Sequence, residues 1–261
     1  MRALTYTRFE LVRTFRNARL LIFALGFPLA LYLVIAGPNR GAQDLGGSGI
    51  SLRLYYMVSL VAFGAMMSLI STGARIASER TDGWTRQLRI TPLPARAYLN
   101  AKLATGYAMA LATIALLATA GLALGVRLPA VRWLEMVGLL LIGLLPFAAL
   151  GVLLGHLLTA DTIGPAAGGL VSLLALVSGN WFPLGDGLLQ DVAQFLPSYW
   201  LVQASHVALG GAAWSATGWL VIGGWTLALG VLARARSGAT PNGSDRSAPN
   251  RERRRLIARS R

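Results

Sequence analysis

Residues 136–155 read MVGLLLIGLLPFAALGVLLG, a run without a single charged or polar side chain. A helix rises about 1.5 Å per residue, so about 20 apolar residues cross the roughly 30 Å hydrocarbon core of a bilayer. In lipid every backbone polar group needs a partner within the protein, and a helix supplies nearly all of them. The run therefore predicts a transmembrane helix, in which Pro146 is expected to interrupt the backbone hydrogen bonds.

Five other runs are similarly long and free of charge, which predicts an all-α membrane protein with six transmembrane helices. The six runs are residues 20–37, 54–74, 103–125, 136–155, 163–182 and 214–233. The first is the shortest, and a cleaved signal peptide is the alternative for it. We favour a retained helix, because the charged segment before it is long and its apolar core exceeds that of a signal peptide.

The distribution of positive charge predicts the orientation. Of the 24 Lys and Arg residues, all but four fall on the side that holds the N-terminus, the loop 75–99 and the C-terminal tail. Cytoplasmic loops carry this excess, so we expect a protein of the cytoplasmic (inner) membrane with both termini in the cytoplasm. Because the basic residues lie beside the membrane, nucleic acid is not an expected partner. Five tryptophans fall near the predicted outer interface, where such rings are favoured: Trp133, Trp181, Trp200, Trp214 and Trp219.

The first 19 residues predict an amphipathic helix along the inner membrane surface. Leu4, Leu11 and Phe15 share an apolar stripe, Glu10 lies on the opposite face, and Arg8 would reach anionic head groups. The alternative is an ordinary positively charged leader. At the other end of the chain, residues 237–261 are rich in Gly, Ser, Pro and Arg and predict a disordered basic tail after a membrane domain of residues 1–236.

Residues 183–213 contain two apolar pieces that are too short to span the membrane. Pro197 separates them, and we expect two short re-entrant helices that dip into the outer leaflet. Phe195, Pro197, Tyr199 and Trp200 are candidates for an outer gate. The alternative is a plug that only fills space between the spans.

Several kinds of chemistry have no residues to support them in this sequence. Without cysteine there is no thiolate metal site or cysteine nucleophile. No phosphate-binding P-loop and no catalytic serine or zinc motif occurs, and the two histidines fall on opposite sides of the predicted membrane. We therefore expect a chain that is not an enzyme and binds no cofactor or metal. Pairs such as Gly151/Gly155 permit close helix packing, but among 30 glycines we draw no contact from them.

The cytoplasmic loop 75–99 is the most distinctive segment. We expect a short helix from Glu79 to Leu88, with Trp84 and Leu88 on one face, ended by Pro92 in the sequence Thr-Pro-Leu-Pro. An apolar pair flanked by charges is typical of a docking surface for a partner protein. The alternative is a connecting loop whose only role is its positive charge.

This loop resembles that of the permease subunit of type-2 ABC transporters. The family carries a glutamate, a glycine, a leucine, a Thr-Pro turn and a lysine, which correspond here to Glu79, Gly83, Leu88, Thr91-Pro92 and Lys102. The basic N-terminal helix, the six-span layout and residues 196–200 extend the resemblance over nearly the whole chain except the tail.

The resemblance implies an exporter driven by ATP, in which two permeases, identical or paired with a sibling, dock on two copies of a cytoplasmic ABC ATPase. Glu79, Gly83, Trp84, Leu88 and Pro92 would couple this chain to the ATPase, where ATP and magnesium would bind. The family transports mainly drugs, lipids or polysaccharides, and spans without acidic residues favour an amphipathic, drug-like or lipid-like cargo, which would make multidrug efflux and antibiotic resistance expected roles. The alternatives are a channel or secondary carrier that works without an ATPase, and a membrane-embedded enzyme.

Overall fold

The computed structural model describes residues 2–38, 50–83, 95–185 and 187–238, and all regular structure in these ranges is helical. Five helical stretches are long and apolar enough to cross a membrane: Leu52–Thr81, Arg96–Ala123, Ala130–Leu157, Ala160–Val177 and Ala216–Arg236. The last five runs expected from the sequence each lie largely on one of them. The chain is therefore an all-α protein with several candidate spans.

The first expected run, residues 20–37, forms a different kind of helix. It consists of α2 (Ala18–Leu21), a π-helical turn η1 (Ile22–Gly26) and α3 (Phe27–Ala36). Within it Ala24–Ala36 is a shorter apolar helix and is not counted among the five long stretches. Pro28 is the second residue after the π-turn, and because proline has no backbone N–H, the regular hydrogen-bond ladder cannot continue through it.

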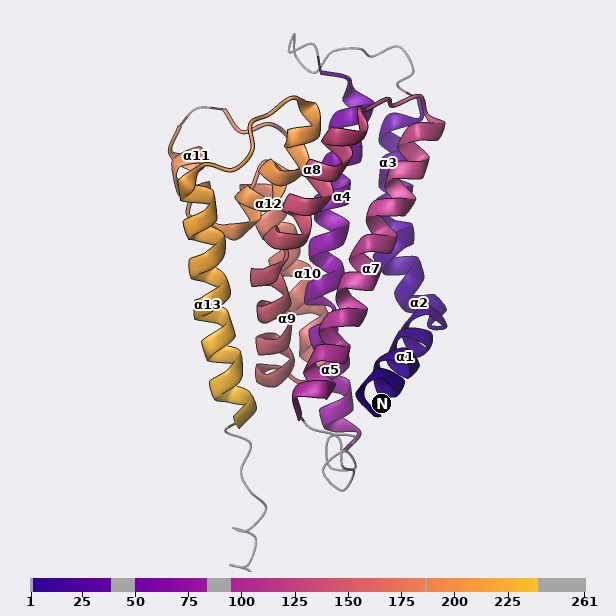
Figure 1. Ribbon diagram of the computed structural model, residues 1–261, viewed down its shortest axis with the longest axis vertical. Helices are drawn as coiled ribbons and strands as arrows, with labels where there is room; N and C mark the ends of the chain where they lie inside the picture. Colours follow the sequence, from indigo (N-terminus) through magenta and orange to yellow (C-terminus); the bar gives the residue numbers. More distant parts are fainter. Residues whose placement is uncertain (1, 39–49, 84–94, 186, 239–261) are drawn as a thin grey trace, which may run out of the picture.

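The bundle is built around α4 (Leu52–Ile70), which is almost entirely buried (Figure 1). It packs against α3, α7 (Ala95–Ala123), α9 (Leu145–Leu157), α10 (Ala160–Val177) and α12 (Pro197–His206). Its buried side chains, Met57, Leu60 and Leu69 among them, form the centre of the main apolar core. The helix needs no alternation of polar and apolar residues because neighbours cover it on all sides.

Two long stretches are interrupted. The first continues from α4 through Ser71 into α5 (Thr72–Thr81), so residues 75–78, expected to connect the span to a separate short helix beginning at Glu79, are helical instead. The second is divided between α8 (Ala130–Gly143) and α9 at Leu144, two residues before Pro146, which confirms the expected break at this proline.

The two ends of the bundle differ in what they contain. At one end, at the bottom of Figure 1, lie α1 (Arg2–Phe15), the last turns of α5 and the end of α13 (Ala216–Gly238). At the opposite end lie α11 (Leu188–Ala193), α12 and the 3-10 turn η2 (Val207–Leu209). Neither α11 nor α12 is long enough to be one of the candidate spans.

Candidate functional site

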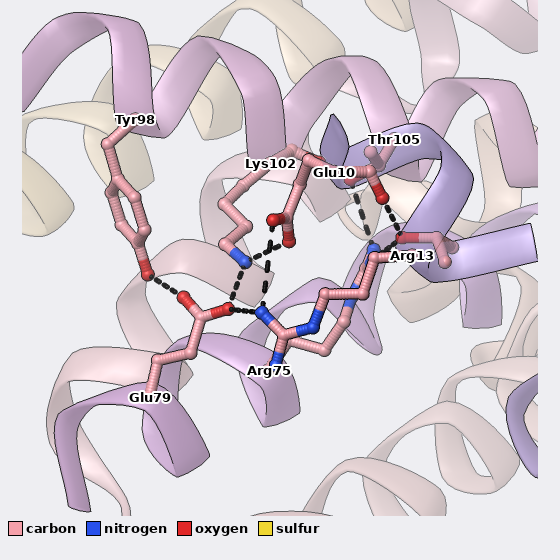
Figure 2. A network of polar contacts seen from close by, with 8 residues as sticks. Glu10, Arg13, Arg75, Glu79, Tyr98, Lys102 and Thr105 are labelled. Atoms are coloured by element: carbon pink, nitrogen blue, oxygen red, sulfur yellow. Dashed lines mark hydrogen bonds and ion pairs between the residues drawn. The ribbon is translucent and has the colours of Figure 1, made fainter. Parts of the chain in front are cut away.

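Three helices bring a cluster of charged side chains together at the α1 end of the bundle (Figure 2). Each helix contributes residues three or four positions apart, which places them on one face. The contributing residues are Glu10, Arg13 and Thr14 from α1, Arg75 and Glu79 from α5, and Tyr98, Lys102 and Thr105 from α7. We refer to these eight residues as the charge cluster.

Lys102, the only lysine of the chain, is at the centre of the charge cluster. Its side chain is fully buried, and Nζ donates to Glu10 Oε1 and, at 2.6 Å, to Glu79 Oε1. The ammonium also lies 5.3 Å from the centre of the Tyr98 ring, a cation–π distance. A buried ammonium is costly unless it is paired, so this side chain requires both carboxylates.

Glu79 on α5 accepts hydrogen bonds from side chains of the other two helices of the charge cluster, α1 and α7. Tyr98 Oη donates to its Oε2 at 2.7 Å, and Arg13 Nη1 donates to its Oε1 at 3.0 Å. Only 3% of Glu79 is exposed. Its carboxylate is therefore bonded within the protein.

Arg75 joins the same three helices through hydroxyl groups. Its guanidinium donates to Thr14 Oγ1 on α1 and, at 3.2 Å, to Thr105 Oγ1 on α7. A cavity of about 240 Å³ lies beside it between α1 and α5, with Asp82 at its edge. The charge cluster thus holds α1 against α5 and α7 through charged and polar contacts.

The orientation of α1 follows from these contacts. Its acidic residue, Glu10, is 1% exposed and faces the bundle, whereas Leu4, Phe9, Val12 and Phe15 remain exposed, Leu4 to 77%. Leu11 is partly buried and Arg8 is exposed. The apolar face predicted from the sequence is therefore directed away from the protein, and the polar face makes the contacts.

The end of α5 accounts for one further residue of the loop sequence. The helix stops at Thr81, and Gly83 adopts φ of +73°, the left-handed conformation that favours glycine after a helix. The helix expected from Glu79 to Leu88 therefore does not run through Gly83. Trp84, Leu88 and Pro92 lie outside the described residues.

A second set of contacts fixes α5 against α9. A Cβ added at Gly73 would lie 2.3 Å from the carbonyl oxygen of Gly151, and one added at Gly155 would lie 2.7 Å from that of Gly73. The two backbones therefore touch, as small residues allow in membrane proteins. Arg80 Nη1 also donates to the carbonyl oxygens of Gly155 and His156 at 2.7 Å.

Three of the outer-gate candidates lie on α12 at the opposite end, and the fourth, Phe195, lies in the connection between α11 and α12. Pro197, Tyr199 and Trp200 are buried, while Phe195 is exposed. Indole N–H groups fix this region: Trp200 donates to Gln194 O, and Trp214 donates to Trp200 O, both at 2.8 Å. The apolar side chains of α11, Leu188, Leu189 and Val192, are exposed.

The resemblance to the permease family marked Glu79, Gly83 and Lys102, but the sequence did not reveal that Glu10 and Glu79 both pair with Lys102. One signal was available: Glu10 is the lone acid of its helix and Lys102 the lone lysine of the chain. Among the described residues, no group of three or more His, Cys, Asp or Glu side chains is placed to hold a metal ion.

Comparison with known proteins agrees with this arrangement. The sequence model described as "ABC-2 family transporter protein" matches residues 48–233. The chain is also similar to the "Putative transport permease YvfS" of Bacillus subtilis (strain 168), with 32% identity over 196 residues that cover 73% of this chain and 78% of that protein. The family model's match, residues 48–233, includes α4 to most of α13, and with them two of the three helices of the charge cluster. The chain is a multi-pass membrane protein that belongs to the ABC-2 family of transporter membrane proteins.

Proposed function

We propose that this chain is the permease subunit of an ATP-driven ABC exporter that docks on a pair of cytoplasmic ABC ATPases. The observation that carries the proposal is the charge cluster, which joins α1, α5 and α7 at one end of the bundle. Since α5 ends at Thr81 and α7 begins at Ala95, the segment that connects them leaves and re-enters the bundle beside this cluster. This segment contains Trp84, Leu88 and Pro92, the proposed contacts with the ATPase.

The contacts of the charge cluster suggest how a movement of that segment would reach the spans. A push on the end of α5 would act on α7 and α1 through Glu79 and on α9 through the close glycine contact and Arg80. Ionic and backbone contacts of this kind are stiff, because separating them leaves buried groups unpaired. The four helices would therefore move together when ATP closes the ATPase pair, and Glu79 would contribute as a positioning residue.

The placement of α1 supports an interfacial role in the same proposal. Its exposed apolar face, including Leu4 and Phe15, would enter the inner leaflet, and Arg8 would meet anionic head groups. The segment α2, η1 and α3 would form a sixth crossing. With six crossings of the inner membrane, both termini would lie in the cytoplasm. A second permease, identical or a sibling, would complete the transport path.

The opposite end would face outward, with α11 and α12 as short re-entrant helices. The exposed apolar side chains of α11 suit contact with lipid, and the buried Tyr199 and Trp200 suit a closed outer gate. No acidic residue lies in the described middle parts of the five long candidate spans, so an amphipathic, drug-like or lipid-like cargo fits better than a highly charged one.

Co-purification tests the proposal directly. The tagged chain, extracted from the membranes of its native cells in mild detergent, should retain an ABC ATPase. Trp84→Ala combined with Leu88→Ala should lose the ATPase, whereas Leu134→Ala, an exposed leucine at the opposite end, should retain it. If the purified chain alone moves solute across vesicle membranes without ATP, it is a channel or secondary carrier, and the proposal is wrong.

A further inference from the structure

A groove runs between α7, α9 and α13, and α1 contributes none of the described residues of its lining. Its volume is about 510 Å³, more than twice that of the cavity beside Arg75. Most of its lining is aliphatic and comes from all three helices, for example Leu103 of α7, Val152 of α9 and Ala233 of α13. A groove of this composition on a membrane-spanning surface will be filled by something apolar, because leaving it to water would cost free energy.

The polar groups deep in the groove are already bonded within the protein. Tyr107 Oη donates to Leu141 O at 3.2 Å, and Thr226 Oγ1 donates to Ile222 O at 2.6 Å. They do not offer free partners to a polar ligand. The deep part of the groove is therefore suited to a hydrocarbon chain.

The charged groups of the groove are all at one end. Arg96 stands at the start of α7 and Arg234 near the end of α13, and because the two helices run in opposite directions these residues reach the same end of the bundle. Both are exposed, the exposed amide of Asn100 lies one turn further on, and no acidic residue is among the described lining residues. This end is therefore suited to an anion.

The length of the groove matches one leaflet. From Arg96 to Tyr107 the rise along α7 is about 16 Å at 1.5 Å per residue. This is about half of the roughly 30 Å hydrocarbon core of a bilayer. A cationic entrance above an apolar groove one leaflet deep has the dimensions and the polarity of a phospholipid.

We propose that this groove is a binding site for an anionic phospholipid, with one acyl chain between α7, α9 and α13 and the phosphate at Arg96 and Arg234. Basic pockets between membrane helices bind acidic head groups in this way. The inference depends only on the chain being embedded in a membrane and does not require the ATP-driven exporter. Binding of cargo, of the segment 239–261 or of a second copy of the chain would be competing uses of the same groove.

Glycines of α13 allow a matched pair of variants. Gly230 lines the groove, and a Cβ there meets no atom within 4 Å, so Gly230→Leu fills the groove without a clash at the backbone. Gly224 on the same helix is equally open but is not part of the lining, so Gly224→Leu is the control. For the head group, Arg96→Gln with Arg234→Gln removes both cations, and Arg127→Gln at the opposite end is the control.

The full-length chain is purified in mild detergent and equilibrated with vesicles of equal parts phosphatidylglycerol and phosphatidylcholine. Native mass spectrometry then measures which lipid stays bound to the chain. We expect a preference for phosphatidylglycerol that falls about fivefold for each arginine removed. Gly230→Leu should lose the bound lipid, whereas Gly224→Leu and Arg127→Gln should behave like the unmodified chain. Equal phosphatidylglycerol binding in the double arginine variant, or equal loss in both glycine variants, would overturn the proposal. A second chain or residues 239–261 cross-linked into the groove would also overturn it.

Discussion

At the scale of single residues, Lys102 is the side chain on which the charge cluster depends. It is fully buried between Glu10 and Glu79. Lys102→Met removes the cation and leaves two buried carboxylates without it, so we expect a loss of about 3–5 kcal/mol in stability. Thermal unfolding of the purified chain in detergent measures the effect.

A compensating variant separates charge pairing from packing. Lys102→Met combined with Glu10→Gln and Glu79→Gln removes the unpaired charges, and it should recover much of the lost stability because uncharged buried groups are tolerated better. A Lys102→Met protein that unfolds at the same temperature as the unmodified chain would contradict the assignment.

Two tyrosines provide a second prediction at this scale. Tyr98 Oη donates to the ionic Glu79, while Tyr107 Oη donates to the neutral carbonyl of Leu141. Tyr98→Phe should therefore cost about 1.5–3 kcal/mol and Tyr107→Phe only about 0.5–1.5 kcal/mol. The two substitutions delete the same atom from the same helix, so a comparison of their unfolding midpoints isolates the charge of the acceptor. Equal costs would contradict the stronger hydrogen bond assigned to Tyr98 and Glu79.

Only part of the charge cluster was predictable from the sequence. The resemblance to the permease family marked Glu79, Gly83 and Lys102, but a match of residues along the chain does not state which side chains meet. Glu10 pairs with Lys102 from a helix 92 positions earlier in the sequence. The sequence placed Glu10 opposite the apolar stripe, and in the structure this polar face of α1 is the one that contacts the protein.

At the scale of helices, the crossing of α5 and α9 determines how rigidly α5 is held. A Cβ at Gly155 would lie 2.7 Å from Gly73 O and 2.9 Å from Ile76 Cβ. Gly155→Ala must therefore separate the helices, and we expect a loss of about 1–3 kcal/mol.

The control for this crossing is Gly164→Ala on α10, where an added Cβ meets no atom within 4 Å. Alanine there should leave stability unchanged or raise it slightly, since glycine costs more backbone entropy in a helix. Paired melting curves of the two variants check the prediction. If both variants melt alike, the close contact between α5 and α9 does not contribute to stability.

Helix existence was predictable and helix contacts were not. Hydropathy located five long stretches and Pro146 located a break, because both depend on local composition. The pairs Gly151/Gly155 and Gly164/Gly168 look the same in sequence, yet the first touches α5 and the second is open. Only the neighbouring helix distinguishes them, and its identity is a property of the assembled bundle.

At the scale of the whole molecule, the helices differ in how far neighbours cover them. The stretch beginning at α4 is mostly buried, whereas only 22% of the apolar window is buried in α10 and in α13, where Leu173 and Leu227 are exposed. Hydropathy ranks these helices as similar, since lipid and protein interior are both apolar environments. The exposed faces are the ones available for lipid or for another subunit. Which end of each helix faces the cytoplasm is known once the side of the membrane that holds the α1 end has been measured.

The absence of cysteine makes that orientation measurable with single introduced thiols, because the unmodified chain has no thiol to react. Asp82 at the end of α5 and Arg127 between α7 and α8 are exposed at opposite ends of the bundle. With the α1 end in the cytoplasm, a membrane-impermeant maleimide should label Arg127→Cys in intact cells and Asp82→Cys only after permeabilisation. The reverse pattern would place the charge cluster outside and contradict docking on a cytoplasmic ATPase.

The same reagent decides whether α2, η1 and α3 form a sixth crossing. Arg8 and Pro38 are exposed on either side of this segment. Since the segment carries an apolar helix and lies beside α4 and α7, we expect it to cross the membrane, so that Pro38→Cys is labelled in intact cells and Arg8→Cys is protected. Protection of both thiols would mean that the segment returns to the cytoplasmic face. Five crossings would place the two ends of the protein on opposite sides of the membrane. Both ends could then lie in the cytoplasm only if one of the five longer helices also failed to cross.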